Sequence, residues 1–295
     1  EILIGLVGSE MCIRDRDGIL TLEGKTTYSE AAAAKLNGCL VTVSSYKRDY
    51  LTLSKVNGKG ASTALNLTTN RMGTKELSAG ARFFEQVSNG RLVEIDRSDI
   101  TITSIPANKI TYVGYDWAGR VDKLVLNDVT GDCYDYGMIY YRAAGYEESK
   151  DDGSEGSYQN GEIRVTNGSH TDGVSYVVGS VDGAKTNRMG GVAGSLDQLD
   201  GKNRMAAFMP LNEATGIRRA QFDTDAMLLT TNSMVIPISD KVECYNKTTG
   251  DWFKPGEDGD HKAALNLALA FSDDITVYYD RSPEEGGKVR IVVVE

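Results

Sequence analysis

A short phrase occurs twice in this chain, and repetition of this kind constrains a fold more than any single residue does. Residues 126–131 read Leu-Asn-Asp-Val-Thr-Gly, and residues 211–216 read Leu-Asn-Glu-Ala-Thr-Gly. In each place we expect the phrase to end a strand that follows a polar turn. A phrase that returns with conservative changes predicts tandem copies of one small β-rich unit.

A predicted hairpin surrounds the first copy and has an echo near the C-terminus. Residues 110–126 contain two β-branched and aromatic runs on either side of a turn at residues 117–119. Residues 275–294 contain two similar runs, separated by a turn at residues 283–287. Runs of this length between turn formers indicate β-hairpins.

The match between the two regions extends to positions within and before the hairpins. We expect Tyr112 and Val277 to lie on equivalent strands and at the same repeat position, because the alternation of side chains is the same in both. Upstream, residues 82–85 lead to a turn as residues 241–244 do. The upstream strands are therefore expected to correspond as well.

These patterns predict a mainly β fold of tandem small barrel-like or sandwich-like units, built on hairpins and carrying a few short helices. Two less regular hairpins, at residues 40–54 and before residue 209, complete the series. The predicted units are an incomplete one at residues 17–57 and three more at residues 58–131, 132–216 and 217–295.

Helices and loops within these units follow from local composition. Ser29 is a suitable N-cap for a helix at residues 30–36, and residues 262–271, rich in Ala and Leu, predict a second helix. The acidic segment at residues 147–161 has too few apolar residues to bury itself, so we expect a flexible loop in the third unit.

The first residues of the chain have a different character. Residues 6–16 resemble the translation of a transposon-type sequencing adapter, and we therefore expect residues 1–16 to be a non-native tail with few contacts to residues 17–295. Such a tail is typical of a metagenomic fragment. The true N-terminus and any signal peptide would then lie outside this sequence.

Charge and cysteine content exclude several classes of partner and site. The formal net charge of −10 disfavours nucleic acid or an anionic membrane surface as a partner, and we expect no membrane span because no apolar run approaches about 18 residues. Cys12 lies in the adapter-like segment, while Cys39, Cys133 and Cys244 lie far apart. We interpret these three as small core or strand residues rather than as disulfide or zinc ligands.

Candidate catalytic and metal-binding residues are few. The chain has 2 histidines, His170 and His261, and both stand in turn-forming contexts that predict solvated loop side chains. Carboxylates at residues 147–155 and 257–260 could bind calcium, but they lack the alternating spacing of a calcium loop. We therefore expect no catalytic residue, cofactor or metal site. An enzyme would need one of the histidines buried beside a carboxylate or nucleophile from another unit.

Two tryptophans are the remaining candidates for ligand contact. Trp117 and Trp252 each follow an Asp near a turn. Either ring could stack on the face of a sugar, or it could close the open end of a small barrel. We favour the second interpretation and keep the first as the alternative.

Several segments resemble the repeat regions of large secreted proteins of Firmicutes that carry S-layer homology domains. The likeness is carried by residues 109–136, especially 125–132 followed by 134–137, and by residues 244–250, 270–273, 278–280 and 286–290. The S-layer homology domain itself is not among them. The resemblance implies an extracellular, cell-wall-associated structural or adhesive module whose partners are cell-wall polymers or neighbouring surface proteins. The alternative is a carbohydrate-binding module of a surface protein that processes glycans.

Overall fold

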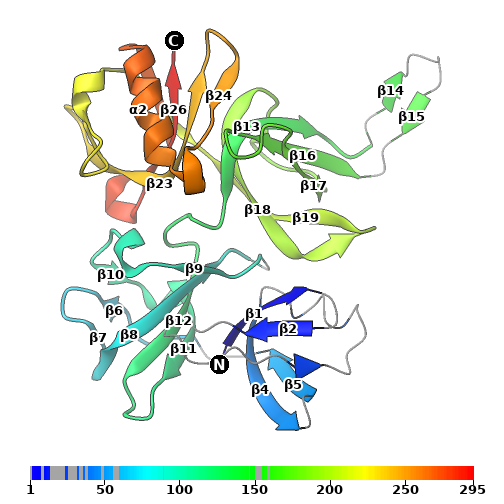
Figure 1. The fold of residues 1–295 in the computed structure, drawn as a ribbon, viewed down its shortest axis with the longest axis vertical. Helices are drawn as coiled ribbons and strands as arrows, with labels where there is room; N and C mark the ends of the chain where they lie inside the picture. The colour runs from blue at the N-terminus through cyan, green and yellow to red at the C-terminus, as the bar shows by residue number, and fades with distance from the viewer. Residues whose placement is uncertain are drawn as a thin grey trace. The chain divides into compact units, whose positions relative to one another are not determined.

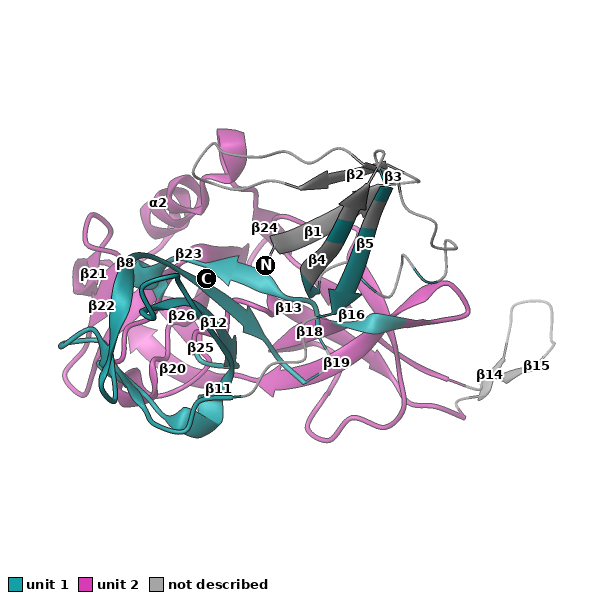
Figure 2. Ribbon diagram, turned by 90° about the horizontal axis from the view of Figure 1, so that it is seen from below, with its two compact units in different colours: residues 1–99, 103–129, 195–197 teal, residues 100–102, 130–194, 198–295 magenta. Residues whose placement is uncertain are grey.

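The structure is a computed structural model in which the chain divides into two compact units. Unit 1 comprises residues 1–99, 103–129 and 195–197, and unit 2 comprises residues 100–102, 130–194 and 198–295 (Figure 2). The residues that the structure describes are 2–7, 10–13, 24–25, 32, 36, 39–47, 50–55, 60–88, 90–145, 147–149, 155–157 and 160–295.

Unit 1 holds a closed barrel and a seven-stranded sheet. The barrel order is β1-β2-β3-β5-β4, with strands β1 (Ile2–Val7), β2 (Glu10–Ile13), β3 (Gly24–Lys25), β4 (Leu40–Lys47) and β5 (Tyr50–Lys55). The sheet order is β10-β6-β7-β8-β12-β11, and β9 pairs with β8. Its strands are β6 (Leu65–Asn66), β7 (Arg71–Met72), β8 (Lys75–Gln86), β9 (Val93–Ile95), β10 (Ser104–Ile105), β11 (Ile110–Tyr115) and β12 (Val121–Asn127), with short helices η1 (Arg97–Asp99) and η2 (Ala107–Lys109).

Unit 2 holds a second closed barrel, ordered β13-β16-β17-β19-β18, and a second seven-stranded sheet (Figure 1). The barrel strands are β13 (Asp135–Arg142), β16 (Gly161–Thr166), β17 (Val174–Val178), β18 (Arg188–Leu199) and β19 (Lys202–Pro210), and β14 (Glu147–Ser149) pairs with β15 (Glu155–Ser157) as a separate hairpin. The sheet order is β20-β25-β26-β23-β22-β21, and β24 pairs with β23. Its elements are β20 (Asn212–Ile217), η3 (Arg219–Gln221), β21 (Phe222–Asp223), β22 (Leu228–Thr230), β23 (Val235–Asn246), β24 (Asp251–Phe253), η4 (Glu257–Gly259), α2 (His261–Phe271), β25 (Ile275–Tyr279), η5 (Pro283–Glu285) and β26 (Val289–Val294).

The fold is mainly β, as predicted, but two kinds of sheet alternate along the chain instead of one. In each barrel the third and fifth strands are paired in parallel, namely β3 with β5 and β17 with β19. In each seven-stranded sheet a long strand pairs in parallel with the last strand, namely β8 with β12 and β23 with β26. The two barrels share one pairing order. The two seven-stranded sheets share five strands in one order, β6-β7-β8-β12-β11 and β21-β22-β23-β26-β25, but their remaining edge strands differ, because β10 pairs with β6 whereas β20 pairs with β25.

One turn shows the correspondence between the two seven-stranded sheets in atomic detail. The side-chain oxygen of Asn66 accepts the backbone N–H groups two and three residues ahead, and Asp223 does the same. Four residues after each of them, Asn70 and Met227 have left-handed backbone conformations with φ of 52° and 49°. The carbonyls of these two residues each accept a hydrogen bond from the long strand that follows. Similar local chemistry therefore builds the same turn from different sequences.

The two copies of the repeated phrase occupy different places in these sheets. Residues 128–131 follow β12, as expected, but residues 212–216 lie within β20, which pairs with β25. The C-terminal sheet therefore begins before the boundary that we predicted at residue 216. Both phrases nevertheless end on a glycine of positive φ, Gly131 at 76° and Gly216 at 69°.

The predicted equivalence of Tyr112 and Val277 is displaced by one residue. Both lie on corresponding strands, but Val277 pairs with Val292, and the counterpart of Val292 in β12 is Leu124, which pairs with Val113. A β-bulge at the start of β11 causes the displacement. Val113 therefore takes the position that we expected for Tyr112.

The upstream match is displaced by two residues. Arg82 pairs with Lys123, and Glu243 pairs with Ile291. Lys123 and Ile291 are equivalent positions, because each stands two residues after the first paired residue of its strand. Arg82 therefore corresponds to Glu243. The alignment of residues 82–85 with residues 241–244 predicted Lys241 instead.

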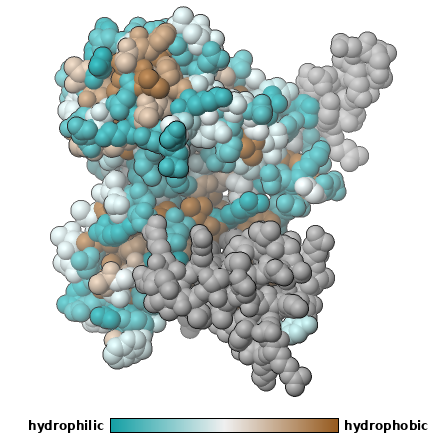
Figure 3. All heavy atoms as spheres, viewed as in Figure 1, coloured by the Kyte–Doolittle hydropathy of each residue, from teal (hydrophilic) through white to brown (hydrophobic). Residues whose placement is uncertain are grey.

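The helix predicted at residues 262–271 is α2. Its N-cap is Asp260, whose side chain accepts the N–H of Ala263 at 3.2 Å. Its buried face packs Leu265 and Ala268 into the core of the C-terminal sheet. Phe271 and Leu267 are exposed, and Figure 3 shows a hydrophobic area over this helix.

Other predicted segments fall largely outside the described residues. Most of residues 29–36 lie outside the described part of the chain, so the helix expected there stays a prediction. In the acidic segment at residues 147–161 the described parts include the hairpin β14–β15. In the adapter-like segment the described residues lie in β1 and β2, and β2 pairs with β3. This pairing differs from the few contacts that we expected, and the non-native origin of the segment stays a prediction.

Unit 2 has separate apolar cores in its C-terminal sheet and in its barrel. Buried residues of the C-terminal sheet and α2 form one core, which includes Cys244, and buried residues of the second barrel form another around Ile163. Cys39 is also buried, whereas Cys133 is partly exposed. Cys39 and Cys244 thus take the core positions predicted for them.

Candidate functional site

The candidate site is a small cavity of about 190 Å³ in unit 2, where one end of the second barrel meets the C-terminal sheet. Charged side chains from several elements converge here. β13, the loop before β17, the strands β23 and β26 and the start of α2 all contribute to its lining. The residues are Asp132, Tyr134, Asp135, Tyr136, Asn167, Ser169, His170, Lys241, Glu243, His261 and Arg290.

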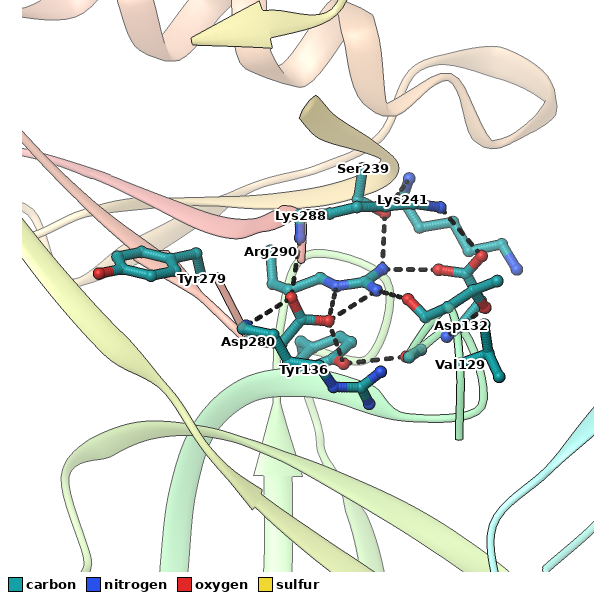
Figure 4. Close-up of polar contacts among 12 residues, drawn as sticks. Val129, Asp132, Tyr136, Ser239, Lys241, Tyr279, Asp280, Lys288 and Arg290 are labelled. Atoms are coloured by element: carbon teal, nitrogen blue, oxygen red, sulfur yellow. Dashed lines mark hydrogen bonds and ion pairs between the residues drawn. The ribbon is translucent and has the colours of Figure 1, made fainter. Parts of the chain in front are cut away.

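Arg290 is the centre of the polar network beside this cavity (Figure 4). Its guanidinium donates from Nε to Asp280 Oδ2 at 2.9 Å, and from Nη1 to Asp132 Oδ1 at 2.6 Å and to Ser239 Oγ at 3.1 Å. Nη2 lies 2.8 Å from Asp280 Oδ2 and donates to the carbonyl of Thr130. A guanidinium has five N–H groups, and each one here has an acceptor inside the protein. The side chain is 2% exposed, so this cation is stabilised by the protein rather than by solvent.

Asp280 is fixed from both sides of its carboxylate. Oδ1 accepts the backbone N–H of Lys288 at 2.8 Å and that of Arg281 at 2.9 Å, which closes the turn between β25 and β26. Oδ2 faces the guanidinium. Tyr136 stacks under the guanidinium, with its ring centroid 4.8 Å from the central carbon, and donates its hydroxyl to the carbonyl of Gly131 at 2.9 Å. Cation–π contact and hydrogen bonds thus hold the entry to the barrel against the sheet.

Asp132 lies in the segment between β12 and β13, and it connects this segment to β26. Its oxygens accept from Arg290 and, at 3.2 Å, from Lys288 Nζ, and all three side chains are at most 5% exposed. Burial would raise the pKa of Asp132, but the positive charges of Arg290 and Lys288 outweigh it and lower the pKa below its usual value. Asp132 is therefore an ionised partner of a buried ion-pair network.

Glu243 fixes the loop before β17 to β23. Its Oε2 accepts the backbone N–H of Gly168 at 2.9 Å, and its Oε1 accepts the hydroxyl of Ser169 at 2.9 Å. Burial raises the pKa of Glu243 above its usual value and outweighs both hydrogen bonds and the nearby His261. His261 Nδ1 lies 3.8 Å from Glu243 Oε1 and 3.1 Å from the carbonyl of Val242.

The two histidines differ from each other, and the prediction of solvated loop side chains is wrong for one of them. His170 is exposed, as expected. His261 is the first residue of α2, and its side chain is only 12% exposed. It lies beside Glu243, but Ser169 donates directly to that carboxylate. In a Ser–His–acid triad the imidazole stands between the other two groups, and this arrangement does not have that order.

The two tryptophans lie in different compact units. Trp117 is 96% exposed, so the expectation that its ring closes the end of a barrel is wrong. The turn that carries it is stabilised by Asp116, whose Oδ1 accepts the N–H groups of Ala118 and Arg120, both at 2.9 Å. Trp252 is partly buried on β24, where its ring centroid lies 4.9 Å from that of Tyr245.

Sequence reasoning missed the network around Arg290, although one signal was present. Residues 289–294 are apolar except for Arg290, and a single charge in such a run needs a buried partner. Its partner Asp132 is 158 residues away along the chain. The sequence pattern therefore predicts that Arg290 has a buried partner, but it does not indicate which residue that partner is.

Comparison with known proteins adds no assignment: no protein-family model, curated protein or solved structure matches this chain. Within the described residues, no group of three or more His, Cys, Asp or Glu side chains is placed to hold a metal ion. The same part of the chain contains no helix with the length and apolar character needed to cross a membrane.

Proposed function

We propose that this chain is a non-catalytic structural or adhesive module of an extracellular, S-layer-associated bacterial surface protein. The observation that carries the proposal is the state of Arg290. Its N–H groups are all bound within the protein, so this buried cation joins the barrel to the C-terminal sheet instead of facing a ligand.

The same logic applies to the other side of the cavity. Both carboxylate oxygens of Glu243 accept hydrogen bonds from the loop before β17, one from Gly168 and one from Ser169. A rigid connection between adjacent sheets suits a module that holds its shape on a cell surface. Removing one member of a buried charge network is costly, which makes such a connection hard to loosen.

The test is co-sedimentation of the chain with purified Gram-positive cell walls, followed by analysis of the supernatant for released wall fragments. We expect the chain to sediment with the walls, the fragments to stay at the level of a blank, and His170→Ala to behave as the parent chain does. The proposal is contradicted if the chain stays in the supernatant. It is also contradicted if fragments are released by the parent chain and not by a folded His261→Ala variant.

One observation favours a second function, carbohydrate binding. Trp117 is exposed on a turn held by Asp116, which also accepts from Arg120 Nε at 2.8 Å. A rigid turn that presents an aromatic ring loses little conformational entropy on binding, and such a ring gives apolar contact to a sugar face. Loss of polysaccharide binding in Trp117→Ala, with stability unchanged, would select this function.

A further inference from the structure

A larger cavity, of about 610 Å³, lies against the second closed barrel and is separate from the charged network. It is lined by the end of β13, the start of β16, the middle of β17 and the turn between β18 and β19. Its volume lies within the range of about 300 to 1,000 Å³ that is usual for small-molecule sites.

The cavity lies where the barrel closes. β17 and β19 close the barrel through one parallel pair, Val177 with Arg204. The cavity lies beside this pair, between residues 175–177 and residues 202–203. The opening is framed by a tight turn in which Asp200 and Gly201 have φ of 50° and 74°. Two left-handed residues in succession are typical of a well-defined hairpin turn, so the rim is preformed.

The walls combine hydrogen-bonding groups with apolar ones. Asn160, Asn203 and Ser175 supply amides and a hydroxyl, which both donate and accept. Val177 and Leu199 supply apolar surface. A ligand with many hydroxyl groups and apolar C–H faces matches both kinds of wall.

The charges of the cavity cancel. Arg142 is paired with Glu162, with Nη2 to Oε2 at 3.0 Å, and the two other charged residues, Lys202 and Asp200, have opposite signs. An anionic or cationic ligand would therefore find no net attraction. We infer that this cavity is a binding site for a neutral saccharide. The inference does not depend on the structural function proposed above, and the site is distinct from Trp117.

The test is isothermal titration calorimetry of the whole chain with cellotetraose, maltotetraose and tetra-N-acetylchitotetraose, and with tetragalacturonate as an anionic probe. At least one neutral tetrasaccharide should bind, and tetragalacturonate should bind at least about tenfold more weakly, a difference of about 1.4 kcal/mol. Binding of none of the neutral probes would overturn the inference.

Two serines provide a matched pair of variants. Ser175 lines the cavity and Ser180 does not, and both are exposed. Ser175→Trp should fill the cavity and weaken binding by at least about tenfold, whereas Ser180→Trp should leave affinity within about twofold. Asn203→Ala, which removes an amide from the wall, should also weaken binding and serves if Ser175→Trp does not fold.

Three results would place the ligand elsewhere or change its class. Affinity that survives Ser175→Trp and Asn203→Ala would overturn the site. Affinity that is lost in Trp117→Ala would move it to the exposed turn of unit 1. A third outcome is that no saccharide binds, but an extended peptide with the sequence of residues 211–217 does, and Ser175→Trp abolishes its binding. This result would show that the cavity binds an extended peptide instead of a saccharide.

Discussion

The hairpins β11–β12 and β25–β26 have the same pairing scheme but opposite electrostatic designs. An aspartate follows the first strand of each, Asp116 in one and Asp280 in the other. The residue after the first ladder position of the second strand is Asp122 in β12 and Arg290 in β26. Asp116 pairs with the half-exposed Arg120, whereas Asp280 pairs with the buried Arg290.

The difference shows how one scaffold can serve two purposes. In the first hairpin the aspartate only stabilises its own turn, which remains in solvent and presents Trp117. In the second, one cation at position 290 recruits Asp132 and the carbonyl of Thr130 from the segment that enters the barrel. The hairpin with Asp122 therefore ends in an exposed turn, whereas the hairpin with Arg290 forms a joint between sheets.

The largest effect is expected from removing that cation. Arg290→Met should lower the free energy of unfolding by about 3 to 5 kcal/mol, because Asp132 and Asp280 would remain buried without their partner. The matched variant Arg120→Met breaks the corresponding exposed pair and should cost less than about 1 kcal/mol. Urea denaturation of both variants measures the difference. Equal effects would mean that the two hairpins are not distinguished by their charges.

The glycines of the repeated phrase sharpen the comparison. Both have positive φ, but a Cβ at Gly131 would lie 2.5 to 2.9 Å from atoms of Asp280, Arg290 and Tyr136, whereas one at Gly216 meets nothing within 4 Å. Gly216→Ala should cost about 1 kcal/mol for backbone strain alone. Gly131→Ala should cost about 2 kcal/mol more, because the network must also shift. Similar losses in thermal and urea melts would show that the network yields freely around residue 131.

A pH profile separates the two carboxylates that hold the joint. The pKa of Asp132 is lowered in the folded state, so its contribution to stability is present above the unfolded value, near 4, and is lost as the pH falls through the folded pKa. The pKa of Glu243 is raised, so its ionised form costs stability at neutral pH, and stability rises as the pH falls toward the unfolded value, near 4.5.

Urea denaturation from pH 7 to pH 3 should therefore show stability first rising and then falling as the pH is lowered. Glu243→Gln should remove the rise, since an amide does not titrate. Its oxygen can still accept the N–H of Gly168, and its NH2 group can donate to the hydroxyl oxygen of Ser169. Asp132→Asn should flatten the fall. A rise that persists in Glu243→Gln would assign it to another group.

Much of the fold was predictable from local pattern, and the joint was not. β-branched runs with turn residues between them predicted both hairpins, and the Ala- and Leu-rich run predicted α2, because these signals are local. The bulge that displaces Tyr112 and the single parallel pair Val177 with Arg204 have no local signal. For the same reason the partners of Arg290 and the burial of His261 beside Glu243 could be found only from the structure.

The smallest effect on stability is expected at the free tip. Because the ring of Trp117 is 96% exposed, Trp117→Ala should change the free energy of unfolding by no more than about 0.5 kcal/mol. Thermal melts and polysaccharide pull-downs on the same variant measure both properties. A large loss of stability would show that the ring is buried in solution, which would bring the two hairpins closer in character.

Native-state hydrogen exchange in the parent chain and in Arg290→Met tests the joint most directly. If the network couples the two sheets of unit 2, the slowest amides of β13 and β26 should exchange through the same opening in the parent chain, with the same dependence on urea. In Arg290→Met, β13 should open at a lower free energy than β26. Separate openings in the parent chain, or a common opening that survives in the variant, would contradict the account.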